Sequence, residues 1–307
     1  MSENISAQAE KRGAAREAWR PASPDVPECI FTVDVEDWFH ILDVPSAPDV
    51  TRWAQIPSHV ERDFHRILDI LDELHGHATC FFLGWIAERF PHLVKEAATR
   101  GHEVASHGYA HQLIYRSTAD EFSRDVRKAR GVLEQITGKA VLGYRAPGFS
   151  ATEDVPWYFD TLAAAGYVYD SSVFPAPRGH GGIADAERAP HVIRTANGGR
   201  LIEFPISVAN VLGRRLCMFG GGYLRLFPSW MILRGSEQVL REGRPVVYYV
   251  HPREINPTHP RMTMNAARRF KSYINLHTTE PKLRRILSRF EVTTFERYIQ
   301  QHPRLSA

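Results

Sequence analysis

The sequence predicts an α/β fold, a distorted (β/α) barrel of about seven strands, and two observations carry this prediction. From residue 29 onward, short apolar segments alternate with amphipathic segments of helical periodicity, and repeated strand–helix units of this kind build a parallel sheet. Polar residues follow several of the apolar segments directly. In parallel barrels such residues gather at the carboxyl ends of the strands, so we expect a single site at one rim.

The strands are predicted from short apolar runs, most of them bounded by polar or turn residues. In chain order the expected strands cover residues 29–35, 78–83, 103–106, 141–145, 167–170, 201–204 and 245–251. The expected helices between them cover residues 60–74, 86–100, 118–137 and 157–165.

The helices are justified by their periodicity and by their end signals. Residues 60–74 carry apolar side chains at helical spacing. The helix after the second strand should break near Pro91. The long helix that follows begins at Thr118, with Glu121 three residues later as a capping box, and ends at Gly138.

Composition divides the chain into three regions. Residues 1–26 are polar and rich in alanine and charge, so we expect a mobile arm. Residues 27–252 should form the barrel, with the glycine- and proline-rich residues 171–223 as loops and hairpins over one end. Residues 253–307 should form a C-terminal extension packed on the barrel, extended through its prolines at first and then folded into two helices.

Length, charge and motifs exclude several classes of protein. A chain of 307 residues with 43% apolar and 24% charged residues can bury a sizeable core. A net charge of +3 with neutral histidines is too small to argue for a nucleic-acid partner. No Walker loop, dinucleotide glycine fingerprint or serine elbow occurs. Three cysteines without close pairing predict buried free thiols rather than disulfides.

The pattern of apolar residues predicts no transmembrane span, because no eighteen apolar residues run together. The N-terminus lacks the basic start and apolar stretch of a signal peptide, so we expect a cytoplasmic protein. A late cluster of basic residues is typical of a solvated helix face, or of peripheral contact with the inner membrane face or an anionic glycan. Its members are Arg261, Arg268, Arg269, Lys271, Lys282, Arg284, Arg285 and Arg289.

Two histidines four residues apart, His107 and His111, are the most specific chemical feature. This spacing predicts that both rings lie on one face of a helical turn and reach one ion. A divalent ion needs further ligands, and a carboxylate is available where the first strand ends, in the acids between Asp34 and Asp37. Two histidines and one carboxylate, with open positions, suit the activation of water against a carbonyl.

Five motifs together resemble the polysaccharide deacetylases of carbohydrate esterase family 4, which share the NodB-homology fold. The motifs stand in the order found in that family and span roughly residues 29–252. They are Asp34–Asp37, His107–His111, Arg145–Gly148, Tyr169–Ser172 and Val250–Pro252.

The glycine-rich stretch Gly220–Tyr223 and the C-terminal extension further resemble the subgroup linked to exosortase-type exopolysaccharide loci. The first motif departs from the family, which has two adjacent aspartates followed by glycine. In a related branch the base and the ligand stand two residues apart, and strand alternation points Asp34 and Glu36 to the same side. We favour Asp34 as base and Glu36 as ligand, and Asp37 is the alternative ligand if the strand ends at Val35 and turns.

The resemblance implies a divalent metal, zinc or a similar ion, held by His107, His111 and one of these carboxylates. Asp34 would take the proton from the attacking water. Arg145, which can bind a carboxylate through two nitrogens, would keep Asp34 ionised.

The leaving amine then needs a proton, and His251 is the candidate acid because imidazole titrates near neutrality. Asp170 would hold the other ring nitrogen of His251. The resemblance implies that the oxyanion is stabilised by the metal and by a backbone N–H near Gly148.

Four aromatic residues could present flat faces to sugar rings, although aromatic residues at strand ends more often fill the core. These residues are Trp38, Tyr109, Phe149 and Tyr223.

The function implied is removal of acetyl from an N-acetylated amino sugar, in an exopolysaccharide or a lipid-linked precursor of one. Two alternatives stay open. One is hydrolysis of another amide, as by a deformylase or an allantoinase-like enzyme. The other is a non-catalytic module that binds glycans on the same fold.

Overall fold

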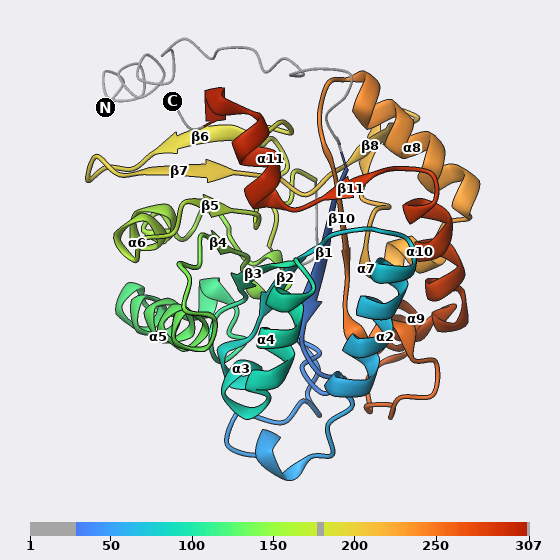
Figure 1. Cartoon of the computed structure of the whole chain (residues 1–307), viewed down its shortest axis with the longest axis horizontal. Coiled ribbons are helices and arrows are strands. Elements are labelled where there is room, and N and C mark those ends of the chain that lie inside the picture. Colours follow the sequence, from blue (N-terminus) through green and yellow to red (C-terminus); the bar gives the residue numbers. More distant parts are fainter. Residues whose placement is uncertain (1–28, 177–180, 306–307) are drawn as a thin grey trace.

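A computed structural model of the chain describes residues 29–176 and 181–305 (Figure 1). The arm predicted at residues 1–26 lies outside the described residues. Seven parallel strands run side by side in the order β10-β1-β2-β3-β4-β5-β7, and β6 joins β7 antiparallel at one edge. The parallel strands are β1 (Cys29–Val35), β2 (Thr79–Phe82), β3 (Glu103–Ser106), β4 (Gly143–Tyr144), β5 (Tyr169–Asp170), β7 (Arg200–Glu203) and β10 (Val246–Val250).

This sheet confirms the predicted α/β barrel class, as a curled half-barrel. Within the described residues it stays open, because its two ends, β10 and β6 (His191–Arg194), are not paired with each other. The central strands β1 and β2 are buried at every residue, so the core lies on both of their faces.

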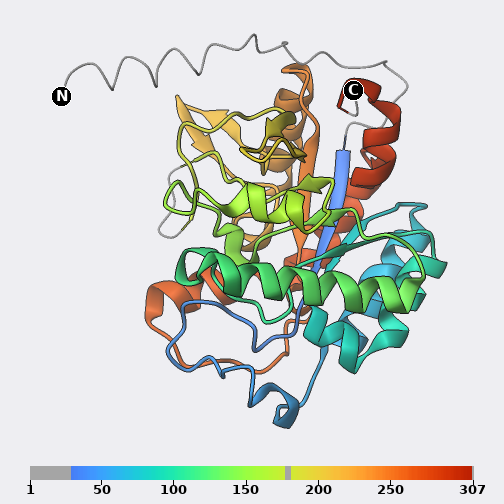
Figure 2. The same ribbon diagram turned by 90° about the vertical axis from the view of Figure 1, so that its left-hand side faces the viewer.

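The helices between the first strands pack together along the outer face of the sheet, as Figures 1 and 2 show. The longest, α5, begins with the predicted capping box at Thr118 and Glu121 and ends at Gly138, whose φ is +67°. Pro91 separates α3 from α4, as predicted. The helices are α2 (Val60–Glu73), α3 (Gly84–Arg89), α4 (Pro91–Thr99), α5 (Ala119–Thr137) and α6 (Tyr158–Ala164).

The region predicted as loops and hairpins, residues 171–223, contains more regular structure than its composition suggests. It holds the antiparallel pair β6–β7 and a separate two-stranded hairpin, and a helix begins in it. These pieces are short, and short pieces give a weak periodic signal. The additional elements are β8 (Ala209–Val211), β9 (Arg214–Leu216), α7 (Gly221–Leu226) and the unpredicted α8 (Ser229–Arg241).

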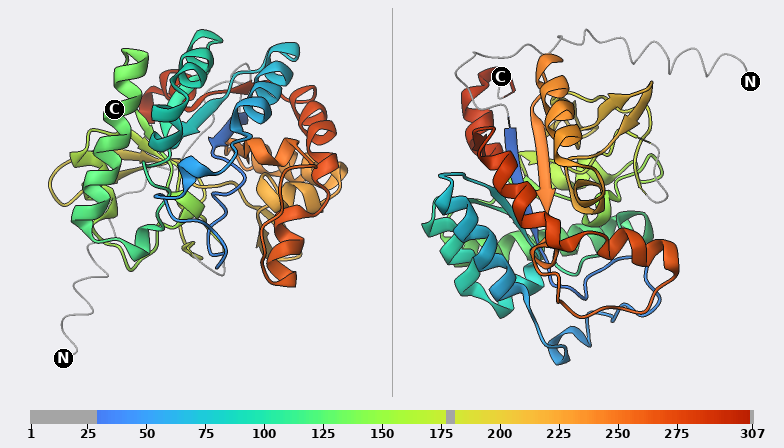
Figure 3. Two further views of the ribbon diagram at one scale, coloured as in Figure 1. Left: turned by 90° about the horizontal axis from the view of Figure 1, so that it is seen from below. Right: turned by 90° about the vertical axis from the view of Figure 1, so that its right-hand side faces the viewer.

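The C-terminal region returns to the sheet instead of forming only two helices. Residues 253–305 contain three α-helices and a short strand, and this strand, β11 (Val292–Thr293), pairs parallel with β1. Figure 3 (right) shows the orange and red helices of this region beside the sheet. The helices are α9 (Ala266–Tyr273), α10 (Thr279–Leu287) and α11 (Phe295–Gln301).

Cys29 and Cys80 are buried, as predicted, and Cys217 is buried as well. None of the helices in the described ranges is long and apolar enough to cross a membrane.

Most of the late basic residues interact inside the molecule. Lys282 donates to three backbone carbonyl groups at the end of α7 and beyond it. Arg284 pairs with Glu73 and Glu280, and Arg268 donates to the carbonyl of Leu42. These contacts explain part of the basic cluster without an external partner.

Candidate active site at the carboxyl ends of the strands

The predicted polar residues lie where the sequence places them, at the carboxyl ends of the parallel strands. Asp34 is near the end of β1, Asp170 ends β5, and Arg145, His107 and His251 directly follow β4, β3 and β10. Because parallel strands end at the same rim, residues more than two hundred positions apart in the chain meet there. Arg145 and His251 lie 2.7 and 3.9 Å from Asp34, and His107 contacts the backbone carbonyl of Arg145.

Asp34 is held by Arg145, as predicted. Arg145 Nη1 lies 2.7 Å from Asp34 Oδ1, and both side chains are buried. The guanidinium also donates to Thr32 Oγ1 at 2.6 Å and to two oxygens of Ser171 at 3.1 Å. The Phe81 ring lies against it, with its centroid 4.2 Å from the guanidinium carbon. The arginine is therefore fixed before any substrate binds.

Glu36 stands between two histidines. Its Oε2 lies 2.9 Å from His111 Nε2, and its Oε1 lies 3.0 Å from His251 Nε2. Burial alone would raise the pKa of Glu36, but the positive charges of the two rings outweigh burial and hold that pKa well below its usual value. The Glu36 side chain is a buried carboxylate that faces the interior of the site.

The His107 ring is neutral and has one unprotonated nitrogen, which could bind a metal ion. Its Nδ1 lies 2.8 Å from the carbonyl oxygen of Arg145. Because a carbonyl only accepts, Nδ1 carries the proton, and Nε2 of the neutral ring is unprotonated. Burial lowers the pKa of His107 to about 4, despite the opposing charge of Asp34, so the ring is neutral at neutral pH.

The prediction of a helical turn at residues 107–111 is wrong. The segment is a loop, in which Gly108 and His111 have φ values of +74° and +52°. Asp125 of α5 holds this loop by accepting the backbone N–H groups of Tyr109 at 2.7 Å and Ala110 at 3.0 Å. The two histidine rings still approach each other, with centroids 5.4 Å apart.

Asp37 points away from the histidines. The strand does end at Val35, which was the condition for Asp37 as ligand. However, its carboxylate accepts the Ser58 hydroxyl and the backbone N–H of His59, at the start of α2. A carboxylate at a helix N-terminus satisfies free N–H groups and favours the helix dipole. The structure thus places Glu36, and not Asp37, against the histidines.

Asp170 does not contact His251, so the predicted pairing is wrong. Its carboxylate accepts the Tyr158 hydroxyl at 3.0 Å and the Ser172 hydroxyl at 2.6 Å, and it faces Glu203 on β7. Burial raises the pKa of Asp170 to about 6.

The carboxylate beside His251 is Glu254, which sequence reasoning missed. Glu254 Oε1 lies 3.5 Å from His251 Nδ1, long for a hydrogen bond but close for an ion pair. Burial would lower the pKa of His251, but the charges of Glu36 and Glu254 outweigh burial and raise it to about 9. The one available signal was an acid three residues after the histidine.

Two of the four predicted sugar-contacting aromatics are engaged elsewhere. Phe149 is buried and packs against Tyr249, with ring centroids 4.9 Å apart. The Tyr109 hydroxyl donates to Glu88 at 2.6 Å, and Lys128 Nζ lies 3.3 Å from its ring centroid. Phe149 therefore fills core, and Tyr109 contacts the helices outside the rim.

The other predicted contacts lie on the loops and on α7. Trp38 donates from Nε1 to the carbonyl of Pro57 at 3.0 Å. Tyr223 on α7 keeps 40% of its surface exposed. Gly148 has a φ of +62°, a conformation that glycine adopts without steric cost.

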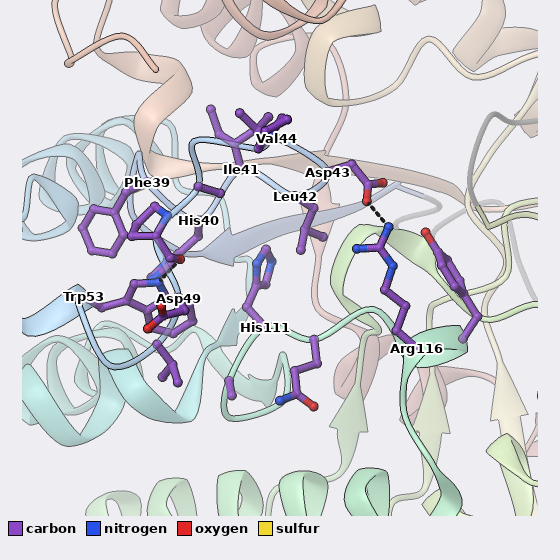
Figure 4. Close-up of a pocket in the computed structure, with 17 residues that line it drawn as sticks. Phe39, His40, Ile41, Leu42, Asp43, Val44, Asp49, Trp53, His111 and Arg116 are labelled. Carbon is purple, nitrogen blue, oxygen red and sulfur yellow. Dashed lines mark hydrogen bonds and ion pairs between the residues drawn. The ribbon is translucent and has the colours of Figure 1, made fainter. Parts of the chain in front are cut away.

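A pocket of about 860 Å³ opens beside His111 (Figure 4). The long loop after β1 supplies most of its wall, including Phe39, His40 and Trp53, and an ion pair of 3.0 Å joins Asp43 to Arg116 across it. Figure 2 shows this blue loop beside the orange segment that follows β10. The wall combines apolar and aromatic side chains with polar ones such as Asp43, His111 and Arg116, as is typical of ligand pockets.

His40 is a pocket residue that the sequence analysis did not single out. Its Nδ1 accepts the backbone N–H of Asp37 at 3.0 Å, and its ring centroid lies 5.7 Å from that of His111. Its Nε2 is buried and makes no hydrogen bond to any described residue.

The side chains at this rim are of the kinds that bind a divalent ion, although their ligating atoms do not surround a single point. Among residues 29–176 and 181–305, no three His, Cys, Asp or Glu side chains are arranged to hold an ion as they stand. Glu36 Oε2 nevertheless makes no aligned hydrogen bond to a described residue, and His107 Nε2 is unprotonated. One carboxylate and two imidazoles, from His107 and His111, form a donor set of open metal sites.

Two family models match the chain in tandem. Residues 56–169 match "Polysaccharide deacetylase", and residues 171–300 match "Domain of unknown function (DUF3473)". Asp34 and Glu36 precede both matches, and His251 lies in the second.

Curated relatives are similar over part of the chain. A Helicobacter pylori peptidoglycan deacetylase is 32% identical over 108 residues, which are 35% of this chain and 36% of that protein. A Bacillus cereus peptidoglycan-N-acetylglucosamine deacetylase is 27% identical over 138 residues, 45% of this chain and 63% of that protein. The matched segment thus covers less than two thirds of either relative.

Solved structures share the fold over nearly the whole chain. A Mycobacterium smegmatis protein described as a polysaccharide deacetylase has a TM-score of 0.61 at 20% identity, over 95% of this chain and 96% of its own. The allantoinase PuuE has a TM-score of 0.62 at 15% identity, with the same coverage. At these identities the likeness concerns the fold alone.

Proposed function

We propose that this chain, a polysaccharide deacetylase of NodB type joined to a DUF3473 domain, removes acetyl groups from N-acetylated amino sugars in a glycan. One observation carries the proposal. The buried Asp34–Arg145 pair and the Glu36 carboxylate, with its two histidines, meet at one rim. The names of the curated relatives support an acetamide of an amino sugar as the bond that is hydrolysed.

Asp34 acts as the general base. Arg145 holds its carboxylate at 2.7 Å and is itself fixed by four further hydrogen-bonding or ring contacts. The fixed cation directs the Asp34 carboxylate, so that it can take a proton from water. Glu36, His107 and His111 would hold a divalent ion, which would supply a Lewis acid that acidifies water and polarises the acetamide oxygen.

His251 acts as the general acid. Its Nε2 lies 3.9 Å from Asp34 Oδ2, so base and acid face the same reacting centre. After attack, the protonated ring gives its proton to the departing amine.

The glycan we propose is an exopolysaccharide or a lipid-linked precursor of one, reached from the cytoplasmic side. The stretch Gly220–Tyr223 and the C-terminal extension motivate this choice, through their resemblance to the exosortase-linked subgroup. The pocket beside His111 would receive a neighbouring part of the substrate, since its wall offers both aromatic side chains and polar groups to a sugar. Fractionation of native cells that places the protein in the periplasm would contradict the proposed compartment.

Acetate release tests the proposal. Metal-stripped protein, reloaded with zinc or another divalent ion, is given N-acetylglucosamine oligosaccharides and, separately, allantoin and a formamide. We expect acetate only from the oligosaccharides, loss of activity on stripping, and a fall of at least roughly 100-fold in Asp34→Asn. Turnover of the small amides alone would assign another hydrolase activity. Glycan binding without turnover, with every metal tried, would assign a binding module.

A further inference from the structure

We infer that Glu254, supported by Arg225, positions His251, so that the DUF3473 region supplies part of the reaction machinery. This inference rests on the proposed function, since His251 is the acid of that reaction. Both residues lie within residues 171–300, and neither was expected to take part from the sequence.

The turn after β10 brings Glu254 back onto His251. A 3₁₀ turn, Pro252–Ile255, starts directly after the histidine, and the Glu254 backbone N–H donates to the His251 carbonyl at 2.9 Å. This turn brings the Glu254 carboxylate back to His251. Glu254 Oε1 lies 3.5 Å from Nδ1 of the ring, and Oε2 lies 3.4 Å from the His251 backbone N–H.

Arg225 contacts the same Glu254 carboxylate oxygen that faces His251. Both side chains are only 1% exposed, and Arg225 Nη2 lies 3.3 Å from Glu254 Oε1. A buried carboxylate without a charged partner would be costly. Burial raises the pKa of Glu254, but Arg225 and His251 outweigh burial and lower it to about 2, so the group stays charged.

Arg225 is in turn held by backbone carbonyls at the end of α9. Its Nη1 donates to Ser272 and Ile274, each at 3.0 Å, and its Nη2 donates to Lys271 at 3.2 Å. These three hydrogen bonds hold the guanidinium group in place. A chain of fixed contacts runs from α9 through Arg225 and Glu254 to the imidazole.

The two ring nitrogens of His251 thereby face different partners. Nδ1 faces Glu254, whereas Nε2 faces Glu36 at 3.0 Å and Asp34 at 3.9 Å, on the reacting side. A carboxylate behind Nδ1 favours a proton on that nitrogen and orients the ring, so that Nε2 faces the reacting centre. This is the role that sequence reasoning gave to Asp170, and Glu254 is a positioning residue because it acts through His251.

A double-mutant cycle tests the inference on the full chain. Glu254→Gln and His251→Ala are made singly and together, and kcat and KM for acetate release are measured. We expect Glu254→Gln to lower kcat roughly 100-fold with KM changed less than about 2-fold. In the His251→Ala background the same change should cost almost nothing more. An equal loss in both backgrounds would mean that Glu254 acts only on the fold, and would overturn the inference.

Two further proteins keep the test decisive. If Glu254→Gln unfolds because Arg225 is left unpaired, the double variant Arg225→Met/Glu254→Gln removes both charges and is measured in its place. Glu237→Gln is the matched control, because Glu237 lies in the same region in a partly exposed pair with Arg289. We expect its kinetics to stay unchanged.

A readout without activity separates this inference from the proposed function. The ¹⁵N and ring-proton signals of His251 are recorded in the wild type and in Glu254→Gln, and assigned with His251→Ala. We expect the Nδ1 signals to shift. If the wild type releases no acetate yet these signals shift, the proposed function fails and the positioning stands. Unchanged signals would overturn the positioning.

Discussion

Glu36 and Asp37 are neighbouring acids in the chain, and their environments differ completely. Glu36 lies between two imidazoles, whereas Asp37 accepts the backbone N–H of His59, the residue directly before α2. The difference arises from a single backbone turn after β1, in which the Glu36 N–H donates to the Asp34 carbonyl at 3.0 Å. Of these two adjacent carboxylates, Glu36 therefore belongs to the candidate active site, and Asp37 binds the start of α2.

The matched variants Glu36→Ala and Asp37→Ala separate these two uses. We expect Glu36→Ala to lose bound divalent metal and acetate release. Asp37→Ala should keep both and lower the free energy of unfolding by about 1 kcal/mol, the usual contribution of a helix cap. Metal content, acetate release and urea unfolding provide the check. Metal lost in Asp37→Ala and kept in Glu36→Ala would assign the ligand to Asp37.

Arg145 cannot be replaced by lysine, because its planar guanidinium group donates to several partners at once and does not act through its charge alone. Arg145→Lys keeps one positive charge but cannot contact Asp34, Thr32 and Ser171 together. We expect loss of activity and a decrease of about 3 kcal/mol in unfolding free energy, as for a broken buried pair. Arg116→Lys, in the exposed pair with Asp43, is the control and should change stability by less than about 0.5 kcal/mol. Equal effects of the two substitutions would refute this account.

At the scale of elements, a loop and a helix together present the histidines. Residues 107–111, directly after β3, form no helix or strand, and α5 holds them through Asp125. The helix is long and well capped, so the acceptor it carries is rigidly placed. A precise site is thereby built on a loop, because a neighbouring helix satisfies the loop's N–H groups.

Removing that acceptor should weaken the site without touching a ligand. We expect Asp125→Ala to reduce the affinity for the divalent metal roughly 10- to 100-fold, which is the usual effect of losing a residue that orients the metal ligands. Asp120→Ala, on an exposed position of the same helix, should leave affinity unchanged. Competitive titration with a chelator gives both values. An unaltered affinity in Asp125→Ala would show that the loop holds its shape alone.

At the scale of the whole molecule, the chain closes on itself at the end of the sheet opposite the site. Buried Glu103 on β3 accepts the Thr79 hydroxyl of β2, the Tyr169 hydroxyl of β5 and the Glu296 N–H of α11. The C-terminal helix is therefore joined to the central strands through one carboxyl group. Burial raises the pKa of Glu103 from 4.5 to about 7, against the lowering effect of its hydrogen bonds.

This raised pKa predicts a pH dependence of stability. The folded state binds a proton that the unfolded state releases at lower pH. The contribution of Glu103 is therefore fully present below about pH 4.5 and is lost as the pH rises to about 7. The loss amounts to roughly 3 kcal/mol at most. We expect Glu103→Gln to remove this part of the pH dependence.

Urea unfolding of the wild type and Glu103→Gln from pH 5 to 9 measures the difference directly. The wild type should lose stability relative to the variant as the pH rises, and the difference should level off above about pH 8. A difference that is independent of pH, or that grows in favour of the wild type, would contradict the assigned pKa.

The sequence by itself determined the class of fold and the rim that carries the chemistry. Apolar runs of strand length, separated by periodic helices, predicted the parallel sheet, because burial on both faces requires such runs. Asp34, His107, Arg145 and His251 followed from being next to those runs. Even the capping box of α5 was readable, since its residues are local.

The tertiary structure alone decided which partner each buried polar group has. Asp37 serves α2, Asp170 serves Tyr158 and Ser172, and Glu254 stands behind His251. Arg225, which locks Glu254, and β11, which pairs with β1, arise from segments far away in the chain. Periodicity encodes which face a side chain takes, whereas hydrogen-bond partners depend on how separate elements pack. The rim could therefore be predicted, and the contacts within it could not.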